Sequence, residues 1–233
     1  SYLNTLASTP ERMPTLQTPS QRNFPAEESK VLQKQLYARL QQDENAVFYT
    51  EMLAWAFMQQ NDYRNALRQM RALDKRLREN GGRVFQLAQI AASAKDYDAA
   101  IAAYDYIVEE KGRNSTFYLE AKREALRCRR NKLTEGFAYT RDELLILQSQ
   151  YESFLSEFGR SRITAGIITE QAELEALYLN DLDKAVALLT QVIEFPNLDP
   201  IIAANAKLDL GDYYLMQGEI WEATLLYSQV DKA

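Results

Sequence analysis

Two segments decide the fold of this chain: LAWAFMQQNDYRNALRQMRAL at residues 53–73 and LAQIAASAKDYDAAIAAYDYI at residues 87–107. Their start positions lie 34 residues apart. The residues that align are Ala54 with Ala88, Asp62 with Asp96, Tyr63 with Tyr97, Ala66 with Ala100, and Met70 with Tyr104. A third copy, LGDYYLMQGEIWEATLLYSQV, occupies residues 210–230, and a fourth places Asn180, Leu182, Ala185, Leu189 and Val192 in the same positions. Repeats of this period are typical of stacked helix pairs, none of which can bury its apolar face alone.

The four copies resemble the tetratricopeptide repeat. That repeat has Leu-Gly-x-x-Tyr, then Gly-x-Tyr-x-x-Ala, then a large apolar residue four positions on. The copy at 210–230 matches best, and the resemblance covers roughly residues 45–233. It implies an all-α fold, a right-handed α-solenoid of antiparallel helix pairs. Small residues at Ala54, Ala88 and Gly211 would let the two helices of a pair approach closely.

The amino-acid composition favours helices and excludes several kinds of catalytic and metal site. Only 8 glycines and 6 prolines occur in 233 residues, too few for the many turns of an all-β fold. The chain has no histidine and a single cysteine, Cys128, so one chain offers neither a Cys/His zinc site nor a His-activated nucleophile. We therefore expect no catalytic residues, no metal ligands and no cofactor. No apolar run is long enough to predict a membrane span, and the compartment stays open.

The expected organisation is an extended arm over residues 1–24, interrupted by Pro10, Pro14 and Pro19, followed by one helical-repeat domain over residues 25–233. Pro25 and the acidic residues after it predict the start of an extra helix. About five helix pairs should follow. The pair near 112–160 is atypical, with helices over about 115–131 and 141–158.

The resemblance also implies a site. In tetratricopeptide repeats the first helices line a concave groove, and the partner-binding candidates on it are Glu51, Trp55, Met58, Gln59, Phe85, Gln89, Asp212 and Leu215. Trp55 is the leading candidate because tryptophan dominates interface hot spots. The competing interpretation is that Trp55 covers the preceding unit. The Lys and Asn clamp of chaperone-binding members is missing at these positions.

Charge is unevenly divided. Residues 111–132 carry eight basic residues, whereas residues 165–233 carry twelve acidic residues and three lysines. A basic stripe at Arg64, Arg68, Arg71, Lys75 and Arg78 falls on one helix face, and we expect that face to be solvated. The RCRR segment at 127–130 is a candidate for binding an acidic partner or nucleic acid, and its arginines should favour the Cys128 thiolate. The net charge of −6 argues against general nucleic-acid binding.

The expected function is non-catalytic: a scaffold that binds a peptide or protein partner on its concave face. One alternative is a structural segment of a longer repeat protein, since both ends of the chain look cut and no polar cap follows Tyr227. Another is a helical-repeat enzyme or sugar-binding protein that uses Glu170, Glu173 and Glu175. Self-association is expected through the arm or the uncapped last repeat.

Overall fold

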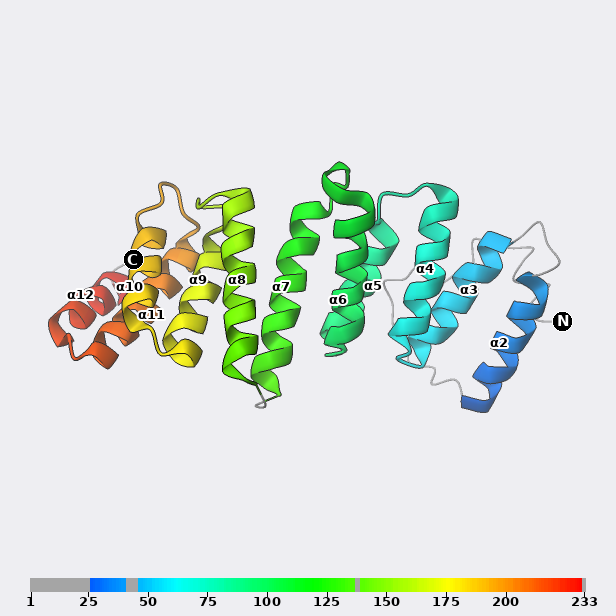
Figure 1. Ribbon diagram of the computed structural model, residues 1–233, viewed down its shortest axis with the longest axis horizontal. Coiled ribbons are helices and arrows are strands. Elements are labelled where there is room, and N and C mark those ends of the chain that lie inside the picture. The colour runs from blue at the N-terminus through cyan, green and yellow to red at the C-terminus, as the bar shows by residue number, and fades with distance from the viewer. Residues whose placement is uncertain (1–25, 41–45, 137–138, 232–233) are drawn as a thin grey trace. The chain divides into compact units, whose positions relative to one another are not determined.

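The computed structural model describes residues 26–40, 46–136 and 139–231, and the arm expected over residues 1–24 lies outside them. The described residues form helices and no strands (Figure 1). The α-helices are α2 (Ala26–Leu40), α3 (Ala46–Gln59), α4 (Tyr63–Leu77), α5 (Gly82–Ser93), α6 (Tyr97–Tyr106), α7 (Tyr118–Glu135), α8 (Arg141–Phe158), α9 (Ala165–Glu173), α10 (Leu182–Ile193), α11 (Pro200–Gln217) and α12 (Ile220–Asp231). Two π-helical segments, η2 (Ile107–Lys111) and η4 (Leu174–Leu179), continue α6 and α9, and a 3₁₀ turn, η3 (Gly112–Asn114), follows η2.

Consecutive helices pack as pairs from α3 onward (α3 with α4, α5 with α6, α9 with α10 and α11 with α12), and an ion pair between Lys122 and Glu157 joins α7 to α8, which makes five pairs within the described ranges. The expected all-α fold of helix pairs is therefore confirmed. The second helix of the atypical pair has its expected bounds, but the first begins at Tyr118 and runs on to Glu135. The chain divides into two compact units, Ser1–Ala121 and Lys122–Ala233, and each is described by itself. The single domain over residues 25–233 stays a prediction.

In the N-terminal unit, the aligned residues of the first two pairs explain where the helices start and how closely they pack. Asp62 and Asp96 are N-caps, and each accepts a hydrogen bond at 3.1 Å from the backbone N–H three residues on. The small residues at the helix contacts, Ala54, Ala66, Ala88 and Ala100, are fully buried. An alanine there lets two backbones approach within the space that a larger side chain would fill.

A buried carboxylate joins these two pairs. Asp74, near the end of α4, has no exposed surface. It accepts hydrogen bonds from the Gly81 N–H and the Tyr106 hydroxyl, both at 2.8 Å, and forms an ion pair with Lys111. Lys111 ends the π-helical segment η2, and its ammonium group also donates to the Glu79 carbonyl at 2.9 Å. The segment after α6 therefore fastens the second pair to the turn that precedes it.

The C-terminal unit has one continuous apolar core built from α7 to α12, with Leu147, Ile168 and Leu189 fully buried in it. Thr140 and Glu143 form a capping box that starts α8, and Asp199 caps α11 just before Pro200. Gly211 lies against the Tyr227 ring, so α11 and α12 approach closely as expected. Among the residues that the structure describes, no helix combines the length and apolar character needed to cross a membrane.

Candidate functional site

The first-helix face of the N-terminal unit is formed by α3 and α5. Glu51, Trp55, Met58 and Gln59 follow one another at helical spacing along α3. A carboxylate oxygen of Glu51 lies 2.5 Å from an Nη atom of Arg83, the second residue of α5. This ion pair joins two successive first helices across the face.

Arg83 was not among the predicted site residues. Its Nε also donates to both carboxylate oxygens of Glu79, at 2.7 and 2.8 Å. Burial alone would lower the pKa of Arg83, but the hydrogen bonds and charges of Glu79 and Glu51 outweigh it and raise that pKa. Arg83 follows Glu51 by 32 residues, close to the repeat length, and opposite charges at this separation are the signal that would have found it.

The predicted groove residues of this unit differ in what they can offer a partner. Trp55 and Met58 are half-buried, whereas Gln59 and Gln89 are exposed. Phe85 is buried: its ring stacks on Phe117 at 5.1 Å and meets Tyr104 edge-on at 5.5 Å. Phe85 therefore packs within the unit, and the accessible part of the face comes from the other residues.

The two remaining candidates, Asp212 and Leu215, lie on α11 in the C-terminal unit, and both are exposed. Asp212 accepts a hydrogen bond from the Tyr227 hydroxyl at 2.6 Å. This bond raises the pKa of Tyr227 to about 12, because the neutral hydroxyl is the donor. The contact ties the first-helix face of α11 to α12.

The arginines of the RCRR segment do not form a free basic patch. Arg127 lies 2.5 Å from Glu170 and 3.0 Å from Glu124, and Arg130 forms an ion pair with Glu173. The expectation of an acidic partner for these two arginines is thus corrected, because α9 of the same unit supplies the acids. Part of the charge asymmetry seen in the sequence is neutralised between α7 and α9.

The expected activation of Cys128 is also wrong. The thiol is buried, and burial together with Glu124 raises its pKa to about 11, against a smaller opposing effect of Arg129. Neighbours in the sequence are about 100° apart around a helix, so the arginines beside Cys128 point elsewhere. The neutral thiol belongs to the packed interior.

The carboxylates named for an enzymatic alternative have partners within the C-terminal unit. Glu175 has no exposed surface, lies 2.8 Å from the Lys184 ammonium and accepts from the Gln148 amide at 2.8 Å. Glu170 also accepts from the Tyr151 hydroxyl at 3.3 Å. Burial raises the pKa of Glu170, and the positive charges of Arg127 and Arg130 oppose that rise. These groups hold α7 to α10 together.

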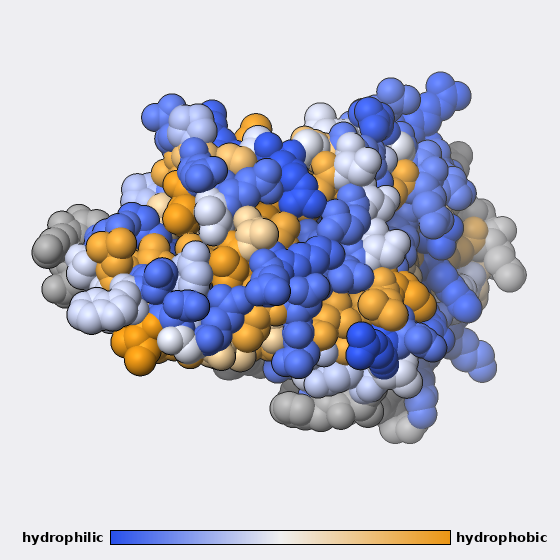
Figure 2. Space-filling view, turned by 60° about the vertical axis from the view of Figure 1, so that its left-hand side comes forward, coloured by the Kyte–Doolittle hydropathy of each residue, from blue (hydrophilic) through white to orange (hydrophobic). Residues whose placement is uncertain are grey.

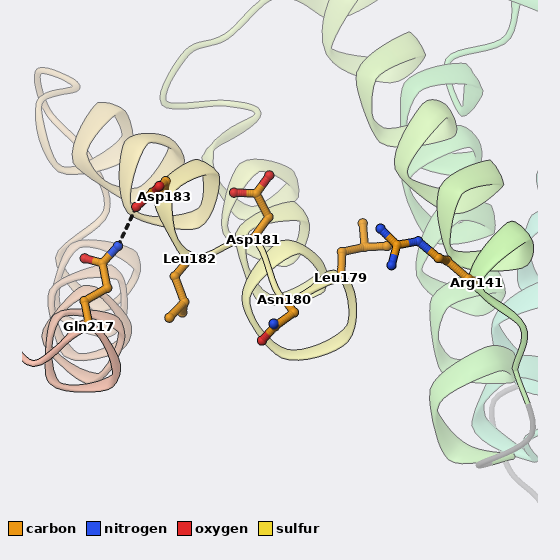
Figure 3. A pocket seen from close by; sticks show the side chains of 7 residues that line it. All are labelled: Arg141, Leu179, Asn180, Asp181, Leu182, Asp183 and Gln217. Atoms are coloured by element: carbon orange, nitrogen blue, oxygen red, sulfur yellow. Dashed lines mark hydrogen bonds between the residues drawn. The ribbon is translucent and has the colours of Figure 1, made fainter.

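A shallow depression of about 480 Å³ opens on the same unit where η4 turns into α10 (Figure 3). Its lining is polar and includes Asp181, whose side chain caps α10, and Asp183, which accepts from Gln217 at 2.8 Å. It contains none of the three glutamates above. Over the described ranges, no cluster of three acidic or cysteine side chains has a geometry that could hold a metal ion.

The basic stripe along α4 is exposed, as expected. Two of its residues contact the second helix pair. The Arg71 guanidinium lies 4.7 Å from the centre of the Tyr106 ring, and the Lys75 ammonium lies 3.1 Å from the Glu110 carboxylate. The stripe therefore covers the outward side of α4 and α6.

Comparison with known proteins agrees with this architecture. Residues 51–115 match the tetratricopeptide repeat family, whereas no curated protein sequence matches the chain. Solved structures that share the fold include the following three. MamA (residues 41 to the end) from Desulfovibrio magneticus RS-1 has a TM-score of 0.54 and 13% identity, over 81% of this chain and 94% of that one. BtubC from P. vanneervenii has a TM-score of 0.57 and 16% identity over 88% of each chain.

The third structure is TTC0263, a thermophilic tetratricopeptide-repeat protein from Thermus thermophilus. It has a TM-score of 0.50 and 19% identity, over 79% of this chain and 89% of that one. Identities this low establish the fold and nothing finer. Residues 51–115 thus match tetratricopeptide repeats, and the described helix pairs share the fold of these solved structures.

Proposed function

We propose that the chain is a non-catalytic scaffold that binds a peptide or protein partner on the first-helix face of its N-terminal unit. The observation that carries this proposal is Trp55, a large aromatic residue left half-buried on that face. Trp55 combines a large apolar area with few rotatable bonds, and such residues contribute about 2 kcal/mol or more when they lie centrally in an interface.

The surroundings of Trp55 suit a polypeptide ligand. Met58 adds a flexible apolar contact, and the exposed amides of Gln59 and Gln89 can each donate to and accept from a peptide backbone. The Glu51–Arg83 ion pair fixes the spacing between α3 and α5 beside them. A partner would thus bury one apolar anchor within a polar rim, the usual arrangement of a protein interface.

A non-catalytic role is supported by how the charged groups are used. Glu170, Glu173 and Glu175 each form an ion pair with an arginine or lysine of the same unit. Tetratricopeptide-repeat proteins typically act through binding rather than catalysis, and this chain shares their repeat and fold.

A photo-crosslinking amino acid, p-benzoylphenylalanine, placed at Gln59 or Gln89 tests the proposal in the native cell extract. Both positions should give the same adduct, identified by mass spectrometry, and Trp55→Ala should abolish it. The matched control is the crosslinker at Arg64, an exposed residue on the second helix of the same pair. If Arg64 gives the same adduct and Trp55→Ala leaves it unchanged, the proposed face is wrong.

A second candidate, a structural segment of a repeat array, is favoured by Ile220. The aligned residue Tyr63 is 5% exposed, whereas Ile220 is 64% exposed. A polar capping helix fused after α12 should then raise the thermal midpoint of the C-terminal unit. An unchanged midpoint would count against a stacking role for this face.

A further inference from the structure

Two large apolar side chains lie side by side on α12. Trp221 is 84% exposed and Leu225 is 61% exposed. They are four residues apart, so they are neighbours on one helix face. Figure 2 shows hydrophobic residues among hydrophilic ones on the surface that it brings forward. Trp221 alone contributes on the order of 200 Å² of accessible area.

The other helix pairs show which way these two residues face. In the repeat alignment, the position of Trp221 is held by Arg64, Asp98 and Asp183, all of them exposed. The position of Leu225 is held by Arg68, Ala102 and Ala187, which are exposed as well. In the earlier pairs, further helices follow and these positions still face solvent.

The exposure of Trp221 and Leu225 is therefore not a consequence of stacking. Ile220 differs, because its aligned residue Tyr63 is buried by the helices around it. A following pair would cover the Ile220 position and leave the outward face of α12 open. At these aligned positions of α4, α6 and α10 the residues are charged or alanine, so a tryptophan and a leucine there are a departure that solubility alone would disfavour.

Charge around the two residues indicates what covers them. Glu219 and Glu222 are both exposed, and Glu222 lies three residues before Leu225, so Glu222 and Leu225 are neighbours on the surface of α12. Among the described side chains of residues 200–230, Lys207 is the only basic residue beside four acidic ones: Asp209, Asp212, Glu219 and Glu222. The surface is thus an apolar patch in an acidic rim.

We propose that the outward face of α12, formed by Trp221 and Leu225 with Glu219 and Glu222, is a second docking surface that binds a cationic amphipathic helix of a partner protein. The apolar ridge of such a helix would cover Leu225 and the Trp221 ring. Its Lys and Arg side chains would pair with the two glutamates and lie over the indole face. An anionic membrane would be repelled by the same acidic rim.

The probe is a synthetic peptide with the sequence of residues 62–78, DYRNALRQMRALDKRLR, which is a basic amphipathic helix in this chain. It contains no tryptophan. In a Trp55→Phe background, Trp221 is the sole tryptophan of the protein, so its emission reports on binding. We expect a saturable blue shift with a dissociation constant on the order of 10–100 µM, as a small interface gives.

Two variants and one control define the surface. Leu225→Ser and the double change Glu219→Lys with Glu222→Lys should each weaken binding at least about tenfold, because one removes apolar contact and the other reverses the rim charge. All three residues are exposed, and an unchanged circular dichroism spectrum will show that the variants fold. Ile201→Ser, at a 72% exposed apolar residue at the start of α11, should leave binding unchanged.

Four outcomes would overturn the proposal. The first is no shift of the Trp221 emission when the peptide is added, and the second is equal binding of a peptide in which every Arg and Lys is changed to Glu. The third is a blue shift of that emission on vesicles of anionic phospholipid. The fourth is self-association of the protein that Leu225→Ser abolishes. The last would make a second copy the occupant. The result is independent of the proposed function, because Trp55 belongs to the other unit and is absent from the test protein.

Discussion

Replacing Asp74 with alanine should selectively destabilise the N-terminal unit. The carboxylate is fully buried and receives three donors: the Gly81 N–H, the Tyr106 hydroxyl and the Lys111 ammonium. Alanine would leave the first two without their acceptor, at about 1–3 kcal/mol each. The Lys111 side chain is 16% exposed, so it can partly recover its hydration. Together these losses amount to about 3–5 kcal/mol, the range found when a buried pair loses one member.

Each unit has its own fluorescent reporter, because the two tryptophans of the chain, Trp55 and Trp221, fall in different units. Urea unfolding in a Trp221→Phe background follows the N-terminal unit, and in a Trp55→Phe background the C-terminal one. Asp74→Ala should lower the unfolding free energy reported by Trp55 and leave the midpoint reported by Trp221 in place.

Two further variants give losses of unfolding free energy against which the Asp74→Ala loss can be compared. Tyr106→Phe removes one donor but keeps the ion pair, so it should cost about 1–2 kcal/mol. Glu109→Ala changes an exposed acid in the same π-helical segment and should stay within about 0.5 kcal/mol of the parent. If Asp74→Ala cost less than about 1 kcal/mol, or no more than Tyr106→Phe, the buried carboxylate would not be what joins the first two pairs.

Three other predictions rest on single sites. Gly81→Ala should cost the N-terminal unit about 1–3 kcal/mol in the same urea assay, because Gly81 has a φ of +90° and an added Cβ would lie 3.1 Å from Ile107. Lys184→Met should lower the unfolding free energy of the C-terminal unit by about 1–3 kcal/mol, because the Glu175 carboxylate stays buried without its partner while Lys184 is one-third exposed. An unchanged unfolding free energy reported by Trp221 would contradict a stabilising ion pair. Cys128 should react slowly with a thiol reagent at pH 8 and rapidly in urea. Because its folded pKa of about 11 exceeds the unfolded value of 9.0, the stability that it contributes should be intact below pH 9 and fall as pH rises toward 11; fast labelling of the folded protein would refute this.

The repeat register made much of the fold predictable. Asp62 and Asp96 align because each caps a second helix, and Ala54, Ala66, Ala88 and Ala100 align because each lies where two backbones meet. These features depend on contacts within one pair or with the next, which a 34-residue period reports directly. The exposure of the α4 basic stripe followed from helical spacing alone.

In the irregular part of the repeat, residues adjacent in the sequence gave wrong predictions of which groups interact. Arg127 and Arg130 form ion pairs with Glu170 and Glu173, each 43 residues further along the chain. The repeat length does not suggest this separation. Cys128 has arginines beside it in the chain, yet it points into the core. Successive residues on a helix diverge by about 100°, so adjacency in sequence says little about which charges a side chain meets. Arg83 was missed for another reason, because its partners Glu51 and Glu79 come from two different segments and only the near-repeat separation from Glu51 pointed to it.

The repeat alignment has a further use, because it predicts how exposed each position should be. A residue that departs from its aligned counterparts in chemistry while keeping their exposure was not placed there by packing. Phe85 aligns with Glu51 and is buried, so its apolar character is explained by the Phe117 and Tyr104 rings. Trp221 aligns with Arg64, Asp98 and Asp183 and is as exposed as they are, so packing within the chain gives no reason for an indole there. By this criterion, binding of a partner is the explanation left for Trp221. The same argument applies to Leu225, whose aligned counterparts are also exposed.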